Sequence, residues 1–367
     1  MMVTRHVEIA GAGITGLTLA AALAQAGWTV RVHESADQLR STGGGLYLRE
    51  DGAEAARRLG IWNDILAGAF APAGLELRVD GRQLSVEPED PHVRTMLRSH
   101  LHGTLAAAAR RAGAEILFGS KVVAASAAGH LDLADGSRRK ADLVVAADGV
   151  GSAIPASLGI PARRLRYDDG LIRVLLDRRV LVGAQWDRTI DFWHYGETAL
   201  RILYSPCGPQ HCYLCLMSAV GDDQASALPI AIDYWSRAFP ELQPLLAQPG
   251  TSARYDRYGM IRLEQWSSGR AAVIGDAAHG MPSSLGRGAS VGMLSAVELA
   301  ARLADSASIE AALSAWEAGQ RPLVELVQAE AERVAGSRSL AERNRIDADI
   351  RISGAATHAH APTGERL

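Results

Sequence analysis

The residues of this chain that could do binding chemistry begin with Gly11-Ala12-Gly13-Ile14-Thr15-Gly16, a glycine-rich run near the start of the sequence. Gly11 allows a tight turn, Gly13 lets a pyrophosphate approach the backbone, and Gly16 lets a helix and a strand pack closely. Glu34 follows at the spacing of about 20 residues at which a carboxylate holds a ribose. The combination predicts a dinucleotide-binding turn rather than an ordinary glycine-rich turn.

A second group begins with Gly275-Asp276 and continues through the loop residues Pro282, Gly286 and Gly288 to an apolar helix over Met293–Leu303. A carboxylate such as that of Asp276 accepts hydrogen bonds from a neutral polyhydroxyl chain and repels a phosphate. The N-terminus of the helix offers backbone N–H groups and a positive dipole to an electron-rich group. We therefore expect a ligand with a sugar-alcohol chain and an electron-rich part.

The elements around these residues form an α/β pattern. Val7–Ala10 is predicted as a strand, Leu17–Ala26 as a helix and Thr29–His33 as a second strand. The apolar run Leu143–Ala147 ends in Asp148-Gly149. Ligands bind beyond the carboxyl ends of strands in open parallel sheets, so both Gly/Asp pairs should face one crevice.

A different rhythm indicates a second sheet. The stretch from Asp169 to Tyr258 contains short β-rich segments separated by turns, and Leu75–Val86 is a hairpin with Asp80-Gly81 as its turn. Helices are expected at Ile309–Ala318 and Pro322–Ala335. An antiparallel substrate-binding sheet is therefore predicted beside the parallel one.

Composition excludes several classes of protein. The 367 residues carry a formal net charge of −3 with scattered basic residues, which argues against a nucleic-acid or membrane partner. Three cysteines do not suit a disulfide framework, and Cys212 and Cys215 should point to opposite faces of a strand, so we expect no metal site. The protein is expected to be cytoplasmic, as a monomer or homodimer.

These motifs resemble those of the flavoprotein aromatic hydroxylases, the single-component (class A) FAD monooxygenases, over Val7 to about Ala335. Three motifs carry the resemblance. They are GAGITG with Glu34, the strand ending in Asp148-Gly149, and GDAAH with the glycines that follow it. The runs GLYLR, ADLVVAADGVGS, DGLIR, TIDFW and RILYSPC look most like the oxygenases that hydroxylate a hydroxypyridine carboxylate and open its ring.

The resemblance implies an FAD cofactor, NADH or NADPH as electron donor, O2 as co-substrate and a small aromatic substrate. It implies that Tyr47, Arg201 and Tyr213 line the substrate pocket, with Arg201 attracting a ring carboxylate and the Tyr213 phenol bonding the ring nitrogen or hydroxyl. The residues expected to hold FAD are Gly11, Gly13, Ile14, Thr15, Gly16, Glu34, Ser35, Arg40, Arg98, Val122, Asp276, Gly286, Gly288, Ala289 and Ser290.

The implied fold is a Rossmann-like FAD-binding domain of the p-hydroxybenzoate hydroxylase type, with an inserted antiparallel substrate domain and C-terminal helices. The expected bounds are 1–74, 98–165 and 266–305 for the FAD-binding domain, 75–97 and 166–265 for the substrate domain, 306–350 for the helices and 351–367 for a disordered tail. Arg201 and Tyr213 share a face of their hairpin only if the loop around Pro206 to Gln210 has an odd number of residues.

The sequence departs from the family pattern at four positions. Gly151 and Pro155 stand where arginine is usual, Ser290 where asparagine is usual, and Gly74 where the pyridine oxygenases place a pocket tyrosine. The missing phenol suggests a larger or differently substituted ring. The alternatives are an FAD hydroxylase of another aromatic acid or natural-product ring without ring cleavage, an NAD-dependent dehydrogenase, and a flavin-binding scaffold without turnover.

Overall fold

A six-stranded sheet forms the base of the molecule in the computed structural model, which describes residues 5–39, 44–249 and 251–336. Its strands pair in parallel except for the edge pair β18 and β19. In spatial order they are β18 (Ser267–Ser268), β19 (Ala271–Val273), β12 (Leu143–Ala146), β1 (His6–Ala10), β2 (Thr29–His33) and β8 (Glu115–Leu117).

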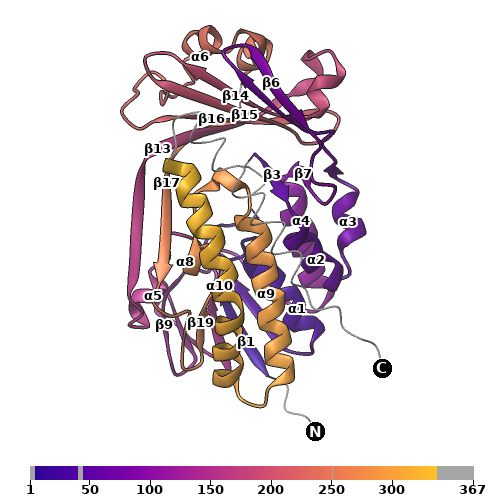
Figure 1. The fold of residues 1–367 in the computed structure, drawn as a ribbon. Coiled ribbons are helices and arrows are strands. Elements are labelled where there is room, and N and C mark those ends of the chain that lie inside the picture. The colour runs from indigo at the N-terminus through magenta and orange to yellow at the C-terminus, as the bar shows by residue number, and fades with distance from the viewer. Residues whose placement is uncertain (1–4, 40–43, 250, 337–367) are drawn as a thin grey trace.

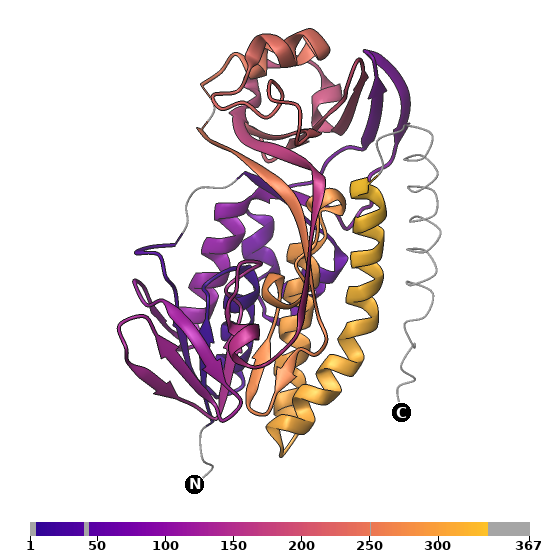
Figure 2. The ribbon, with the colours of Figure 1, turned by 90° about the vertical axis from the view of Figure 1, so that its left-hand side faces the viewer.

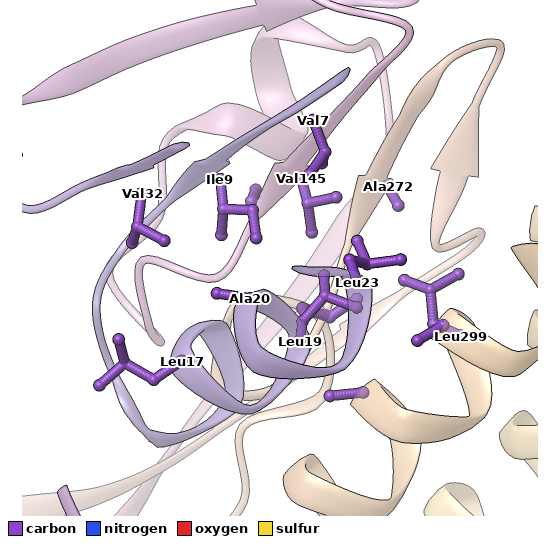
Figure 3. Packing of buried hydrophobic residues seen from close by; sticks show 14 of the residues in the cluster. Val7, Ile9, Leu17, Leu19, Ala20, Leu23, Val32, Val145, Ala272 and Leu299 are labelled. Atoms are coloured by element: carbon purple, nitrogen blue, oxygen red, sulfur yellow. The ribbon is translucent and has the colours of Figure 1, made fainter. Parts of the chain in front are cut away.

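Helices cover this sheet because their alanine- and leucine-rich faces need burial. Val7 and Ile9 of β1 meet Leu19 and Leu23 of α1, and Leu299 of α9 lies beyond them (Figure 3). All five side chains are at most 1% exposed, and truncating such a leucine to alanine costs about 2–5 kcal/mol. The helices of this part are α1 (Ile14–Gln25), α2 (Glu50–Arg58), α3 (Trp62–Leu66), α4 (Arg98–Arg111), α5 (Ile154–Ser157), α8 (Asp276–His279), α9 (Gly288–Asp305) and α10 (Ile309–Gly336).

A seven-stranded sheet stands at the other end of the molecule (Figure 1). Its neighbours pair antiparallel, apart from β14 and β5, which are parallel. The long strands β13 and β17 run from it down along the first part of the molecule (Figure 2). In order the strands are β17 (Thr251–Leu263), β13 (Ala162–Asp177), β16 (His211–Ala219), β15 (Ala199–Pro206), β14 (Thr189–Tyr195), β5 (Leu75–Val79) and β6 (Arg82–Glu87).

The two faces of this sheet differ in composition. The outer face is apolar and packs against α6 (Ile232–Ala238) and α7 (Gln243–Leu246) through side chains such as Phe192, Ile202 and Trp235. The inner face bears Arg173, Arg201 and Tyr213 on alternate positions of the same strands. We call this second surface the inner face throughout.

Two three-stranded sheets and four 3-10 turns complete the described structure. One sheet contains β9 (Val122–Ser126), β10 (His130–Leu133) and β11 (Arg138–Lys140), and the other β3 (Gly45–Leu48), β7 (Arg94–Leu97) and β4 (Ala69–Phe70). The turns are η1 (Arg178–Val180), η2 (Ala184–Asp187), η3 (Pro240–Leu242) and η4 (Ser283–Leu285).

The α/β architecture with an antiparallel sheet and C-terminal helices is confirmed, and so is the Asp80-Gly81 turn, where both residues have positive φ. Arg94–Leu97 pairs with β3 in one of the smaller sheets, because this stretch returns to the start of α4. The domain bounds themselves stay predictions.

The two expected C-terminal helices are one helix, α10, with Pro322 inside it. A proline removes one helical hydrogen bond, but Trp316 and Val324 are buried on either side of it and hold both halves against the core. The expected tail at 351–367 and residues 337–350 lie outside the described residues. No helix in the described ranges has the length and apolar character needed to cross a membrane.

Candidate functional site

The turn between β1 and α1 is packed so closely that only glycine fits at two positions. Gly11 has a φ of +101°, and a Cβ there would lie 2.5 Å from the carbonyl oxygen of Ala147, just after β12. A Cβ on Gly16 would lie 2.1 Å from the carbonyl oxygen of Gly11. Gly13 is the N-cap of α1 and brings no side-chain cap, so the first N–H groups of the helix are left for a ligand.

Glu34 stands beside this turn at the end of β2. One carboxylate oxygen accepts a hydrogen bond from the backbone N–H of Ala12 at 3.0 Å, and the other accepts from Ala36 N at 3.0 Å. Ser35 adds a longer bond of 3.3 Å from its hydroxyl. The oxygen that accepts from Ala12 has a further lone pair, so Glu34 is fixed in place and can still accept from a sugar hydroxyl.

The predicted adenine side of the site is only partly described. The carbonyl oxygen of Glu34 accepts from the backbone N–H of Ser120, which brings the segment before Val122 next to the acid. Val122 itself starts β9 and packs against the main core. Arg40 lies outside the described residues, so its predicted contact stays a prediction.

Thr15 joins the two glycine-rich groups. A Cβ on Gly275 would lie 2.7 Å from the Thr15 hydroxyl oxygen, and one on Gly292 of α9 would lie 2.4 Å from it. The start of α1, the end of β19 and the start of α9 therefore meet at one side chain. The two groups that the sequence separates by more than 250 residues form one site.

Asp276 lies at the point where these elements meet. Its side chain is open to solvent, yet the surrounding protein raises the pKa of its carboxyl above the ordinary value, and Arg98 at the start of α4 opposes that rise. A Cβ on Gly288, the first residue of α9, would lie 3.9 Å from an Asp276 oxygen. A carboxylate surrounded by protein but reachable from solvent suits a ligand that donates hydroxyl hydrogens.

The loop before α9 reaches the inner face. Gly286 has a φ of +62°, and a Cβ there would lie 3.3 Å from the side chain of Tyr47. Gly288 and Ala289 are half-buried at the helix start. Ser290 is fully buried, and its hydroxyl accepts a hydrogen bond of 3.0 Å from Arg49 N, so this side chain holds the start of α2.

Tyr213 and Arg201 do share the inner face, because five residues, Cys207 to His211, lie between the paired Pro206 and Cys212. They are not adjacent: Tyr213 pairs with Ser205, and Arg201 pairs with Met217. Four residues along a strand span about 13 Å. The two predicted pocket residues therefore mark opposite ends of one surface.

Tyr213 is covered by two glycines at the start of β3, Gly44 just before it and Gly45 as its first residue. A Cβ on Gly44 would lie 1.8 Å from the Tyr213 ring, and one on Gly45 would lie 2.4 Å from the sulfur of Cys207. Burial raises the pKa of Tyr213 well above its usual value, so the phenol stays protonated. These two glycines therefore let the backbone approach Tyr213 and Cys207 closely.

Tyr47 belongs to a chain of hydroxyl groups at the same end of the inner face. Its phenol oxygen lies 2.5 Å from the Ser205 hydroxyl oxygen and 3.3 Å from that of Thr189. Burial raises the pKa of the Tyr47 phenol. A protonated phenol that bridges two hydroxyls ties β3 to β15 and β14.

Arg201 has a carboxylate partner within the protein. Its guanidinium donates two hydrogen bonds to Asp191, at 2.6 and 3.0 Å, and lies 5.1 Å above the Trp193 ring. Arg201 and Asp191 are each 8% exposed. The predicted pairing of Arg201 with a substrate carboxylate would have to compete with this ion pair.

Arg173 is a second inner-face arginine and was not among the predicted site residues. It donates to Asp256 at 2.5 Å and to the Ser283 hydroxyl of η4 at 3.1 Å, and its electrostatic interactions include Tyr213. The DGLIR run contains it, and a charged residue within an apolar strand was the available signal.

A cavity of about 40 Å³ opens between the inner face, η4 and the end of α10. It is too small for an aromatic ring without movement of its walls and would hold about two water molecules. Its lining residues are Asp169, Trp193, Ala199, Arg201, Met217, Ser218, Tyr258, Ser284, Val334 and Ala335.

The family departures have structural explanations at two positions. A Cβ on Gly74 would lie 2.7 Å from the carbonyl oxygen of Glu87 and near Arg188, neither of which lines this cavity. A Cβ on Gly151 would meet nothing within 4 Å. Arg164 of β13 supplies a guanidinium there, donating to the carbonyl oxygens of Val150 and Ser152.

Comparison with known proteins agrees with this geometry. A family model described as FAD binding domain matches residues 4–331. The chain belongs to this family. It is 39% identical to the 2-heptyl-3-hydroxy-4(1H)-quinolone synthase of Mycobacteroides abscessus, over 91% of this chain and 90% of that protein.

Further relatives are aromatic monooxygenases. The phenazine 1,6-dicarboxylic acid hydroxylase of Lysobacter antibioticus is 31% identical, over 92% of each chain. A solved structure of 2-methyl-3-hydroxypyridine-5-carboxylic acid oxygenase superposes with a TM-score of 0.88 at 41% identity, covering 93% of this chain and 94% of that one. The chain is therefore an FAD-dependent monooxygenase of the class A aromatic hydroxylases.

The described residues fit FAD. The clamped glycine turn and the N-terminus of α1 suit its pyrophosphate, Glu34 suits the adenosine ribose, and Asp276 suits the ribityl hydroxyls. These individual contacts stay predictions. Likewise, the expectation of a monomer or homodimer stays a prediction, although a solved form of the pyridine oxygenase is tetrameric.

Proposed function

We propose that this flavoprotein uses NADH or NADPH and O2 to hydroxylate an uncharged N-heteroaromatic ring of the 4-quinolone class. The observation that carries the proposal is the buried Arg201–Asp191 ion pair, because it removes the charge that was expected to select a carboxylate. Arg173 is likewise paired with Asp256. With both arginines neutralised and Asp169 in the cavity wall, the inner face favours a neutral ring over an aromatic acid.

The 39% identity to a quinolone synthase supports this substrate class. A 4-quinolone ring is neutral near pH 7, with an N–H donor and an oxygen acceptor, and it needs no ion pair in its site. Burying a carboxylate between groups that are already paired would leave a charge without compensation.

Bound FAD supplies the oxygen-activating redox chemistry, and the protein binds it, orients the ring and excludes water. The glycine turn, Glu34 and Asp276 hold the cofactor in this proposal. Tyr213, kept protonated by burial, accepts a hydrogen bond from the ring N–H of the substrate through its phenol oxygen and fixes the orientation of the ring.

The role of Tyr213 is tested by Tyr213→Phe. We expect hydroxylation to fall by about tenfold or more, the size that general acid–base or orienting groups usually show, with little change in FAD content. FAD is measured by absorbance and product by mass spectrometry. Unchanged turnover would contradict the role.

A second candidate is hydroxylation of a hydroxypyridine carboxylate. The reaction would also open the ring, as the resemblance to the hydroxypyridine-carboxylate oxygenases implies. The 41% identity to the pyridine oxygenase favours it, as does Arg173, whose side chain is 33% exposed and so within reach of a small anion. In this case a carboxylate would displace Asp256 or share Arg173 with it.

The deciding experiment is a substrate panel with purified, FAD-loaded protein. It compares 2-alkyl-4(1H)-quinolones, hydroxypyridine carboxylates and hydroxybenzoates, each scored for NAD(P)H consumption and coupled product. With ¹⁸O2, ring opening places two labelled atoms in the product and simple hydroxylation one. Preference for the carboxylates would overturn the quinolone proposal. A colourless protein would favour a dehydrogenase, and no stimulation by any ring would favour a scaffold.

A further inference from the structure

Trp193 carries a buried polar group whose role the site has not yet explained. The residue lines the cavity and is 5% exposed, and its indole nitrogen is buried with no hydrogen-bond partner within the described ranges. Leaving a buried donor unpaired forfeits its hydrogen bonds to water and so destabilises the folded protein. Buried polar groups without partners are rare in native proteins and call for an explanation.

The direction of this N–H is fixed by the packing of the ring. Arg201 lies 5.1 Å above the ring centroid, and Tyr195 stacks on the ring at 5.8 Å with an interplanar angle of 11°. Arg201 in turn is held by both oxygens of Asp191. The ion pair thus serves as a platform that orients the indole.

Ser218 is the other cavity residue with a buried polar atom that has no partner in the described structure. A hydroxyl can rotate its hydrogen, and it can donate or accept. The indole N–H can only donate, and its ring packs against Arg201 and Tyr195. Trp193 therefore restricts the ligand more than Ser218 does, because the ligand must place a hydrogen-bond acceptor near the indole N–H.

We propose that the indole N–H of Trp193 donates a hydrogen bond to the exocyclic oxygen of the substrate ring. The inference rests on the proposed function, since a 4-quinolone offers that oxygen as its strong acceptor while its ring N–H is a donor. Trp193 is then a specificity-determining residue. It selects rings that bear an oxygen and aligns them against the cofactor.

The test uses Trp193→Phe, which removes the N–H and keeps an aromatic ring beside Arg201 and Tyr195. The control is Trp62→Phe in α3, whose ring lies under Arg57, away from the large sheet. The probes are 2-heptyl-4(1H)-quinolone and 2-heptylquinoline, which lacks the oxygen. Dissociation constants are measured by calorimetry with FAD-loaded protein.

We expect Trp193→Phe to bind the quinolone about threefold to tenfold more weakly, the effect of one neutral hydrogen bond. Its affinity for 2-heptylquinoline should not change, and Trp62→Phe should match the wild type for both. The substrate KM should rise, and more NAD(P)H should be consumed per product formed.

A spectroscopic readout is independent of turnover. The chain has seven tryptophans, so ¹⁵N-tryptophan labelling gives few indole N–H resonances, and the Trp193 signal is the one lost in Trp193→Phe. It should move downfield with 2-heptyl-4(1H)-quinolone and stay in place with 2-heptylquinoline.

The outcomes separate the two proposals. If the wild type hydroxylates the quinolone while the Trp193 resonance stays in place, or if both probes lose affinity equally in Trp193→Phe, the role of Trp193 is wrong and the function stands. If the wild type neither binds nor hydroxylates the quinolone, both proposals fail.

Discussion

The nucleotide turn and the inner face of the large sheet are built by opposite means. At the turn, Gly11 and Gly16 are needed because carbonyl oxygens lie where any side chain would be. On the inner face, Arg201 and Tyr213 owe their properties to partners on other strands or segments, Asp191 for the first and Gly44 for the second. The turn depends on the absence of a Cβ at its glycines. The inner face depends on the contacts that each side chain makes with other segments.

This difference shows when the type of a residue is enough to predict its role in a site. A glycine in a clamped turn has the same meaning wherever the turn occurs, because backbone geometry is shared by all chains. An arginine on a sheet face can hold a ligand or a neighbouring carboxylate, and only the pairing decides between them. Substitutions in the nucleotide turn and on the inner face should therefore have different effects.

The largest effect is expected from Gly16→Ala. Its Cβ would lie 2.1 Å from the Gly11 carbonyl oxygen, so the turn must open, and we expect loss of bound flavin and destabilisation by about 2–3 kcal/mol or more. Flavin absorbance and urea unfolding measure the two effects. Gly103→Ala in α4 is the matched control, because a Cβ there meets nothing within 4 Å and alanine favours a helix. Equal behaviour of the two variants would contradict the clamp.

The next largest effect, a loss of folding stability, is expected from Asp191→Ala. It leaves the buried Arg201 charge without its partner, which typically costs about 3–5 kcal/mol of folding free energy. The double variant Asp191→Leu/Arg201→Met should lose much less stability, because it removes both charges. Urea unfolding measures the coupling. If Asp191→Ala were neutral, Arg201 would be available for a substrate carboxylate after all.

Asp276→Asn should separate binding from stability. The surrounding protein raises the pKa of this carboxyl in the folded state, so its ionised form disfavours folding at neutral pH. The FAD-free variant should therefore be more stable than the wild type near pH 7, and the difference should vanish as the pH falls through the carboxyl pKa.

The same variant should bind FAD more weakly, by about tenfold, the effect of one charge-assisted hydrogen bond. Flavin titration of the FAD-free protein gives the affinity, and unfolding at several pH values gives the stability. Weaker folding together with unchanged FAD affinity would show that Asp276 acts only within the protein.

The smallest effect is expected from Tyr47→Phe. It removes the phenol that bridges Ser205 and Thr189, and losing a neutral hydrogen bond costs about 1 kcal/mol. Unfolding of Tyr47→Phe, Ser205→Ala and the double variant gives the coupling between the two hydroxyls. Additive effects would indicate that the bond contributes little to holding β3 against the large sheet.

Most of the fold could be predicted because its signals are local. The βαβ unit follows from alternating apolar runs and the glycines between them, and the Asp80-Gly81 hairpin follows from turn chemistry. The single helix α10 could not be predicted, since Pro322 normally ends a helix. Tertiary packing of Trp316 and Val324 overrides that local preference.

The candidate site was predictable in part. From the sequence, Arg201 and Tyr213 were expected to share a face only if the loop between their strands had an odd number of residues. The loop does have an odd number, and the two residues share the inner face. The partners of these residues could not be read from the chain, because Asp191 and Gly44 lie on other elements. Arg173 and Trp193 were missed as site residues for the same reason.

By itself, the sequence determined the tight turn at Gly11 and Gly16 and the positions of Glu34 and Asp276 just beyond two strands, because backbone clearance and strand ends depend on short stretches of chain. Only the tertiary structure decided that Asp191 neutralises Arg201 and that the Trp193 N–H has no partner among the described residues. Charge and hydrogen-bond balance depend on which side chains meet across strands. Sheet register, rather than residue type, therefore determines what this surface can bind.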